Sequence, residues 1–342
     1  MRTFWIITFF SLVSANLFDL FENWAHKFSI QFRDKAHLHE VFRTWSENHR
    51  FIEEINAKNL SFKLGHNPFS GMDSEQFRVF MGFDKPSVPT YDYLTQGYNE
   101  AVFESYKSEF NSVYVPENVD WSLRGGVTPV KDQGQCGSCW SFSATGALEG
   151  AYFTKYGVLD SFSEQQLVDC DTRLNGGKDM GCKGGLMDNA FAWITKNGGL
   201  CTEQDYPYVS GTTKTAGQCA TICSVVSKSV VKEFVDVTPS SENAMMSSVA
   251  KQPVSIAIQA DQREFQLYKS GVFTGACGTK LDHGVLLVGY GFFDGLEYWK
   301  VKNSWSTAWG DDGYILLAKG AEYNNGDGQC GLLLQGSYPV LL

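Results

Sequence analysis

The sequence of 342 residues lacks long hydrophobic runs and clusters of basic residues. Its N-terminal apolar run, residues 4–13, is about half as long as the roughly 20 residues that a membrane-spanning helix needs, so we expect no membrane anchor. Lys and Arg number 28 against 38 Asp and Glu. Because a basic surface for nucleic acid is missing, nucleic-acid binding is excluded as a function class.

Cysteine is absent before Cys136, so that all nine cysteines lie in the later part of the chain. The chain begins with MRTFWIITFFSLVSANLF, in which one arginine precedes the apolar run and Ser14 and Ala15 follow it. This pattern is typical of a secretory signal peptide, so we assign residues 1–15 to the signal and expect cleavage near Ala15. The predicted location is the secretory pathway, leading to a lysosome or vacuole or to the extracellular space.

The odd number of cysteines has a consequence for pairing. Because the secretory pathway is oxidising, most of its cysteines form disulfide bonds. One of the nine must be left over, either for an intermolecular bridge or as a free thiol with a function.

Before the first cysteine, the pattern of apolar residues is helical. The length of the chain predicts about two domains. An apolar stripe through residues 17–28 and a second pattern over residues 41–59 predict two helices within residues 16–113. Residues 85–114 lose this periodicity and gather Ser, Pro, Gly and Asn, which indicates an extended connector.

The remaining sequence divides into a helical half, about residues 122–226, and a β half, about residues 227–342. Helical patterns cover residues 138–156, 162–170 and 187–199. Short β-branched and aromatic runs bounded by turn residues then predict strands at 230–237, 253–259, 283–291, 296–305, 313–320 and 337–342. This order is typical of an α+β protein with a cleft between the halves. The glycine-rich GYGFFDG at residues 289–295 precedes a strand pattern rather than a helix, so we interpret it as a hairpin turn and not as a nucleotide-binding loop.

The sequence QGQCGSCWSFS at residues 133–143 allows three interpretations of its cysteine pair. A zinc site would need two more ligands, such as Cys219 and Cys223, about eighty residues away. A redox pair would need a βαβ context, whereas the preceding residues are typical of a loop. The third interpretation makes Cys139 a nucleophile at the first turn of a helix, whose N-terminus stabilises a thiolate.

A nucleophilic thiol needs a proton acceptor, and histidine suits this role near neutral pH. Five of the six histidines precede the first cysteine: His26, His37, His39, His49 and His66. His283 is the only histidine in the later part of the chain. If the protein is a Cys-His enzyme, His283 is therefore its base.

The motifs VTPVKDQGQCGSCWSF, GCKGGLMDNA, LDHGVLLVGYG and YWKVKNSWSTAWGDDGY extend this picture. With them the chain resembles a papain-family cysteine protease of the cathepsin L type over nearly its whole length. The resemblance implies a papain-like fold with a helical left domain, a β-barrel-like right domain and the active-site cleft between them. It also implies four catalytic residues, namely Cys139 as nucleophile, His283 as base and acid, Asn303 as the residue that orients the imidazole, and Gln133 as an oxyanion donor.

The same resemblance implies a substrate cleft and excludes other ligands. Its substrate-binding residues are Gly184, Gly185, Leu186, Met187, Ala257, Leu281, Asp282, Gly284, Trp305 and Gln335, with Trp305 also shielding the His283–Asn303 contact from water. The S2 pocket is expected to be apolar and to prefer a hydrophobic P2 residue of a protein or peptide substrate. We expect a monomer with neither metal nor cofactor. A catalytically silent binding or storage homologue and a transpeptidase remain as alternatives.

Residues 16–113 are by resemblance an inhibitory propeptide, and residues 114–342 the mature enzyme. The propeptide departs from the family's pattern at His37 and Val41, where Glu and Arg are usual, so a stabilising salt bridge is missing. It also departs at Gly71, where Asp is usual. We also expect its five histidines to loosen it on acidification. Ser306 replaces the usual Gly after Asn-Ser-Trp.

The resemblance also implies three disulfide pairs: Cys136 with Cys182, Cys170 with Cys219, and Cys277 with Cys330. Parity then suggests a fourth bond between Cys201 and Cys223. Reduced or differently paired thiols at these two positions are the alternative.

Overall fold

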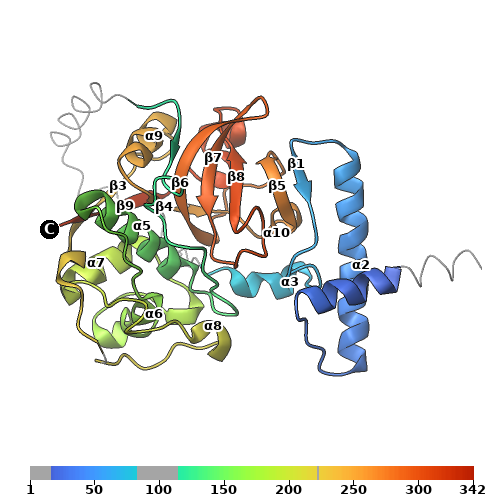
Figure 1. The fold of residues 1–342 in the computed structure, drawn as a ribbon, viewed down its shortest axis with the longest axis horizontal. Coiled ribbons are helices and arrows are strands. Elements are labelled where there is room, and N and C mark those ends of the chain that lie inside the picture. The colour runs from blue at the N-terminus through green and yellow to red at the C-terminus, as the bar shows by residue number, and fades with distance from the viewer. Residues whose placement is uncertain (1–16, 83–114, 222) are drawn as a thin grey trace, which may run out of the picture.

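The protein is described here by a computed structural model that covers residues 17–82, 115–221 and 223–342. The predicted signal peptide and the predicted connector lie outside the described residues. Among the described helices, none is long and apolar enough to span a lipid bilayer. Figure 1 shows a helical N-terminal segment at one end of the molecule, followed by a body in which helices and a twisted sheet lie side by side.

The N-terminal segment, residues 17–82, contains a helix over residues 17–27 and the long helix α2 (Lys35–Ala57). These two helices cross and enclose a small apolar core that includes Phe21, Trp24 and Trp45. Helix α2 begins six residues earlier than the apolar pattern predicts, because Asp34 caps it by accepting a hydrogen bond from the His37 N–H at 2.8 Å.

Two of the departures in the N-terminal segment compensate each other in space. Val41, where an arginine was expected, is buried in the core of the segment. A side chain at Gly71, where an aspartate was expected, would come within 2.7 Å of Val41 Cγ1 and 2.8 Å of Trp24 Cη2. Both positions therefore belong to the apolar packing of this segment.

After α2, the N-terminal segment runs along the body of the protein through β1 (Phe62–Leu64) and α3 (Ser74–Phe77). Strand β1 pairs antiparallel with β5 (Tyr268–Phe273), about two hundred residues later in the chain. The segment thus adds an edge strand to the sheet, and α3 leads the chain toward the middle of the molecule (Figure 1).

The helical half is built around α5 (Cys139–Tyr156), in which every residue from Cys139 to Tyr152 is buried. Helices α6 (Glu164–Cys170), α7 (Met187–Asn197) and α8 (Ser210–Thr213) surround it. The three helices predicted from the sequence agree with α5, α6 and α7 to within about two residues. Gly146 and Gly150 of α5 allow close packing, since a Cβ there would lie 2.8 Å from Leu286 and 2.5 Å from Pro253.

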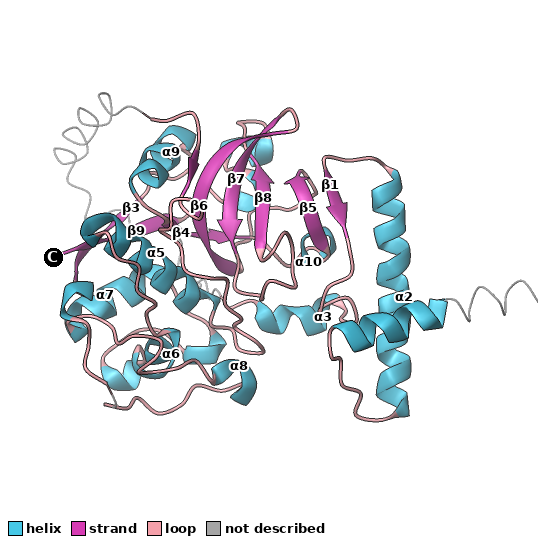
Figure 2. Cartoon of the chain, viewed as in Figure 1, coloured by secondary structure: helices cyan, strands magenta, loops and turns pink. Residues whose placement is uncertain are grey.

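The β half contributes most of a nine-stranded sheet, shown in Figure 2. Besides β1 and β5, the sheet contains β2 (Val119–Asp120), β3 (Val231–Asp236), β4 (Val254–Ile258), β6 (His283–Phe293), β7 (Leu296–Lys302), β8 (Tyr314–Ala318) and β9 (Gly336–Leu341). The β half also contains the helices α9 (Glu242–Lys251) and α10 (Arg263–Gln266). The strand order is β1-β5-β8-β7-β6-β4-β9-β3, with β2 beside β6. The end strands β1 and β3 do not pair with each other, so this sheet is open. The right domain, which we expected to be barrel-like, therefore does not form a closed barrel.

The hairpin between β6 and β7 confirms the interpretation of GYGFFDG. Its turn residues Asp294 and Gly295 have φ angles of 48° and 85°. Positive φ at both positions is typical of the two-residue turn that joins antiparallel strands.

Candidate active site

Cys139 is the first residue of α5 and the one cysteine outside a disulfide bond. The other eight form the bonds Cys136–Cys182, Cys170–Cys219, Cys201–Cys223 and Cys277–Cys330. Cys136, Cys219 and Cys223 are therefore unavailable as zinc ligands, and Cys136 is unavailable as a redox partner of Cys139.

The start of β6 lies against the start of α5. The backbone N–H of Gly284 donates a hydrogen bond to Cys139 Sγ at 3.3 Å. His283, the residue before Gly284, is fully buried. The fold thus brings together the free thiol and the only histidine of the later sequence, which lie 144 positions apart.

The hydrogen bonds of Asn303 decide which nitrogen of His283 carries the proton. Asn303 Oδ1 lies 2.8 Å from His283 Nε2 and also accepts the Ser304 N–H at 2.8 Å. Because this oxygen can only accept, Nε2 must be the protonated nitrogen. His283 Nδ1 has no hydrogen-bond partner among the described residues, so its lone pair is available.

Trp305 covers the imidazole of His283. The two rings are stacked with centroids 4.5 Å apart and planes inclined by 25°. Burial lowers the pKa of His283 to about 4, although the hydrogen bond with Asn303 acts in the opposite direction. The imidazole is therefore neutral in this structure.

Gln133 lies on the other side of the site and is completely buried. Its Oε1 accepts a hydrogen bond from Ser304 Oγ at 2.7 Å, which directs Nε2 toward the opposite side. Nε2 donates to the carbonyl oxygens of Cys136 and Phe80, each at 2.9 Å. The side-chain donor that the sequence analysis assigned to an oxyanion is thus occupied by a carbonyl of the N-terminal segment.

The N-terminal segment crosses the site at residues 80–82. The carbonyl of Gly82 accepts a hydrogen bond from the Gly185 N–H at 3.0 Å. Gly82 has no space for a side chain, since a Cβ there would lie 1.9 Å from the Gly137 carbonyl oxygen. An extended peptide backbone therefore already occupies the wall formed by residues 184–186.

This covering segment reverses an expectation about Cys139. The N-terminus of α5 was expected to stabilise a thiolate, but burial raises the pKa of the Cys139 thiol to about 12. Backbone N–H groups of Gly284 and Gly82 favour the thiolate and only partly offset that effect. The thiol is therefore neutral as long as the segment covers it.

Several of the predicted substrate-binding residues meet beside Cys139. Ala257 of β4 pairs with Gly284 of β6, and the Ala257 N–H donates to the Gln335 carbonyl at 3.0 Å. The sulfur of Met187, at the start of α7, would lie 3.2 Å from a Cβ at Gly284. Leu186 precedes Met187 and caps α7 at its N-terminus.

Two further residues of that set lie at the edge of this group. Leu281 approaches Gly331, where a Cβ would come within 3.0 Å of it. Asp282 Oδ1 accepts the Ala260 N–H at 2.8 Å, and burial raises the pKa of this carboxyl to about 7.

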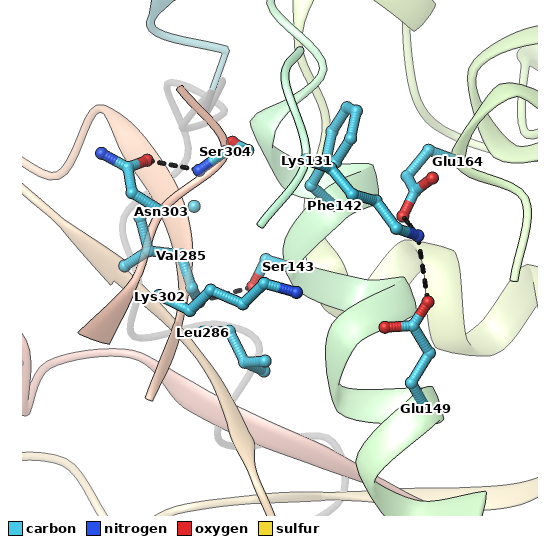
Figure 3. Close-up of a pocket in the computed structure, with 11 residues that line it drawn as sticks. Lys131, Phe142, Ser143, Glu149, Glu164, Val285, Leu286, Lys302, Asn303 and Ser304 are labelled. Carbon is cyan, nitrogen blue, oxygen red and sulfur yellow. Dashed lines mark hydrogen bonds and ion pairs between the residues drawn. The ribbon is translucent and has the colours of Figure 1, made fainter. Parts of the chain in front are cut away.

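Behind Asn303 and Ser304 lies a small cavity with four charged residues in its lining, which the sequence did not predict (Figure 3). Lys131 Nζ lies between two carboxylates there, 3.0 Å from Glu149 Oε1 and 2.6 Å from Glu164 Oε1. Lys302 lines the same cavity, and burial lowers the pKa of its ammonium group to about 8. Charged residues spread over four segments carry no local sequence signal, so only the fold reveals this network.

Ser304 is the other contributor that was missed. It donates to Gln133 through its side chain and to Asn303 through its backbone, so it links two of the predicted catalytic residues. Its place between Asn303 and Trp305 in the sequence was the available signal. Ser306, two residues on, has a φ of 59°, in the region that favours glycine.

Comparisons with known proteins agree with this geometry. Residues 115–340 match the papain family cysteine protease domain, and residues 21–77 match the cathepsin propeptide inhibitor domain. The chain is 43% identical over 322 residues to the senescence-specific cysteine protease SAG39 of Oryza sativa subsp. japonica, covering 93% of this chain and 89% of the rice protein.

Two solved proforms share the fold. The Amb a 11 cysteine protease, a major ragweed pollen allergen, matches with a TM-score of 0.81 and 36% identity, covering 95% of this chain and 94% of that chain. Digestive procathepsin L 3 of Tenebrio molitor larval midgut matches with a TM-score of 0.77 and 31% identity, covering 95% and 99%. The structure places a free buried thiol near a histidine that contacts an asparagine. Together with the family matches over most of the chain, this shows that the protein belongs to the papain family of cysteine proteases and carries an inhibitory propeptide domain.

Proposed function

We propose that the chain is the zymogen of a cysteine endopeptidase. Residues 1–15 are its signal peptide, residues 16–113 its inhibitory propeptide and residues 114–342 its mature enzyme. The observation that carries the proposal is the placement of the free Cys139, at the start of α5, against Gly284, the residue after His283, whose Nδ1 has no partner among the described residues.

Hydrolysis begins when His283 Nδ1 takes the proton of the Cys139 thiol. The thiolate sulfur then attacks the substrate carbonyl carbon, and the C=O π electrons move onto oxygen. Gln133 Nε2 and the Cys139 N–H stabilise this oxyanion, each donor contributing about 3 kcal/mol. His283 returns its proton to the leaving amine as the C–N bond breaks, which leaves a thioester on Cys139.

Water completes the cycle by attacking the thioester carbon. His283 removes a proton from this water, and the C–S bond breaks after a second oxyanion intermediate. The products are a carboxylic acid and the regenerated thiol, which recovers its proton from His283. Throughout, Asn303 keeps the proton of the other ring nitrogen in place, as its 2.8 Å contact with Nε2 indicates.

The proenzyme is inactive for two physical reasons. Its thiol and imidazole are both held neutral by burial, and the propeptide carbonyl of Phe80 occupies the Gln133 donor. Removing residues 80–82 would hydrate both groups and free Gln133.

The substrate preference follows from the predicted S2 pocket. Its residues are apolar or neutral: Leu186, Met187, Ala257, Leu281, Gly284 and Gln335. Burying an apolar P2 side chain is worth about 1.5–3 kcal/mol, so Leu or Phe should be preferred. Arg should be poor because neutral Gln335 offers it no counter-charge. A substrate library led by P2 Arg would contradict this preference.

The test of the function is hydrolysis of a dipeptidyl fluorogenic amide by the processed protein, with and without a thiol alkylator. We expect hydrolysis that the alkylator abolishes, and none from Cys139→Ala. A silent binding or storage homologue would show no hydrolysis in either condition. A transpeptidase would transfer the acyl group to an added amine in preference to water, which mass spectrometry of the products distinguishes.

We further propose that the protein follows the secretory pathway to a vacuole, a lysosome or the extracellular space. Its four disulfide bonds support this location, because such bonds persist in oxidising compartments. Fractionation of cells that express the full chain, with a variant lacking residues 1–15 as control, tests the location.

A further inference from the structure

Two buried carboxylates lie together in the loop between α6 and α7. Asp171 and Asp179 are 0% and 3% exposed. Asp171 Oδ1 accepts the Lys178 N–H at 3.1 Å, and Asp179 Oδ1 accepts the Leu186 N–H at 3.1 Å. The second oxygen of each carboxyl group, Oδ2, has no N–H or O–H partner among the described residues. The two side chains are instead within hydrogen-bonding reach of each other.

Such a pair is stable only with a shared proton. Two adjacent buried negative charges repel each other, and neither is solvated by water. Burial raises the pKa of Asp179, and the Asp171 charge raises it further. Burial also raises the pKa of Asp171, and this rise is partly counteracted by the hydrogen bond with the Asp179 side chain, by the backbone N–H groups of Lys178 and Asp179 and, least, by Lys196 of α7. A proton shared by the two carboxyl groups lets one donate a hydrogen bond to the other and leaves one net charge.

Asp179 also supports the backbone that binds an extended peptide. Besides the Leu186 N–H, its Oδ1 accepts a hydrogen bond from Asn189 Nδ2 at 2.9 Å. Gly185, whose N–H holds the propeptide carbonyl of Gly82, is enclosed between two groups. A Cβ at Gly185 would lie 2.6 Å from Trp140 Cδ2 and 2.7 Å from Asp179 Cγ. The position of the Gly185 N–H therefore depends on the position of the Asp179 carboxyl group.

We propose that Asp179 is a positioning residue for substrate binding, and that the proton it shares with Asp171 keeps residues 184–186 in the geometry that binds peptide. Loss of this proton places two negative charges in contact. The loop then moves apart, the Gly185 N–H loses its alignment, and KM rises while the chemistry at Cys139 is little affected. This inference rests on the proposed peptidase function.

The first test measures kcat and KM of the processed enzyme from pH 4.5 to 8. The concentration of active enzyme is determined by titration with a thiol alkylator. For the unaltered enzyme we expect KM to rise several-fold toward pH 8. The amide side chain of Asp179→Asn can still accept a hydrogen bond from the Leu186 N–H and can donate one to Asp171. The KM of this variant should therefore equal that of the unaltered enzyme at pH 5 and stay constant at higher pH. Asp171→Asn should behave in the same way. Asp179→Ala should raise KM several-fold at every pH, with kcat within about twofold.

Glu203→Gln is the matched control. Glu203 lies in reach of Glu164 and an oxygen of each lacks a partner among the described residues, but Glu164 is also bound by Lys131 at 2.6 Å and Glu203 is only partly buried. Among the described residues, the hydrogen-bond partners of these two carboxylates are Lys131, Thr145 and the Tyr208 N–H, none of which lies in residues 184–186. The Glu203→Gln variant should therefore keep the pH profile of KM seen in the unaltered enzyme.

A second measurement does not depend on activity. Amide hydrogen exchange of the intact proenzyme, read on a peptide spanning residues 183–187, should be slower in Asp179→Asn than in the unaltered protein at pH 8 and equal at pH 5. Equal exchange at both pH values, or KM profiles of Asp179→Asn and Asp171→Asn that follow the unaltered enzyme, would overturn the inference. Absence of alkylator-sensitive hydrolysis would instead refute the proposed function, and the exchange result would still decide the role of the pair.

Discussion

The carbonyl oxygen of Phe80 accepts a hydrogen bond of 2.9 Å from Nε2 of Gln133. The propeptide thus uses the same donor that the proposed mechanism assigns to the developing oxyanion. Two residues later, the carbonyl oxygen of Gly82 accepts a hydrogen bond of 3.0 Å from the Gly185 N–H. Inhibition therefore depends on backbone contacts, which the propeptide side chains must hold in place.

We expect Gly82→Ala to weaken inhibition. A methyl group there would lie 1.9 Å from the Gly137 carbonyl oxygen, so the propeptide backbone must move away from Cys139. Autoprocessing at pH 5, followed by gel electrophoresis, should be about tenfold faster, which corresponds to a loss of about 1.4 kcal/mol of propeptide binding. Val79→Ala is the matched control, because Val79 is 53% exposed in the same segment. Equal processing rates for both variants would contradict this role of Gly82.

The two cysteines of the Cys-Gly-Ser-Cys motif should fail in different ways. Cys139→Ala should yield a folded precursor that neither matures by itself nor cleaves peptide. Cys136→Ala removes the bond to Cys182, and losing such a disulfide typically costs about 2–5 kcal/mol, so this variant should misfold. Soluble yield and peptide hydrolysis distinguish the two. The assignment of Cys139 fails if both variants are equally soluble and equally active.

Five histidines were expected to loosen the propeptide on acidification, and the structure points to His66 among them. Its Nε2 lies 3.0 Å from His49 Nδ1, and its ring stacks on Trp45 at 4.4 Å. Burial, with a smaller contribution from His49, lowers the pKa of His66 from 6.5 to about 4. Because the folded propeptide binds fewer protons than the released one, the stability from neutral His66 is present above about pH 6.5 and is lost as the pH falls toward 4.

We therefore expect His66→Phe, which keeps the stacking but cannot be protonated, to lower the pH midpoint of autoprocessing. The shift should be about 0.5 pH units, since carboxylates also respond to acid. His39→Gln is the control because His39 is exposed. An unchanged midpoint for His66→Phe would show that acid acts elsewhere in the propeptide.

Ser306 is strained by its backbone. At a φ of 59° its Cβ makes the left-handed conformation cost about 1 kcal/mol relative to glycine. Its Oγ accepts the Ala308 N–H at 3.2 Å, which offsets part of this cost. Ser306→Gly should raise the melting temperature of the proenzyme by about 1–3 °C, measured by calorimetry. Ser306→Ala, which keeps Cβ and loses the hydrogen bond, should lower it, and the reverse order would contradict the strain.

Local sequence patterns were sufficient for α5, α6 and α7 and for the strands β3, β4, β6, β7, β8 and β9, whereas β1, β2, β5 and α9 were not predicted. The buried run after Cys139 predicted α5, and Asp294-Gly295 predicted the hairpin between β6 and β7. These features depend on neighbours within a few residues, so periodicity and turn chemistry report them directly. The start of α2 was predicted too late because its cap, Asp34, precedes the apolar pattern.

By itself, the sequence determined the family, the longer helices except α9, six of the nine strands, and the candidate pair of Cys139 and His283. Only the tertiary structure decided the state of that pair, because a pKa depends on how completely distant segments exclude water. The helix N-terminus at Cys139 favours a thiolate, yet the propeptide buries the thiol and reverses the balance. In the same way, the sequence carries no sign that Asp171 and Asp179 differ from ordinary loop carboxylates, whereas the fold buries both and leaves one oxygen of each without a donor among the described residues.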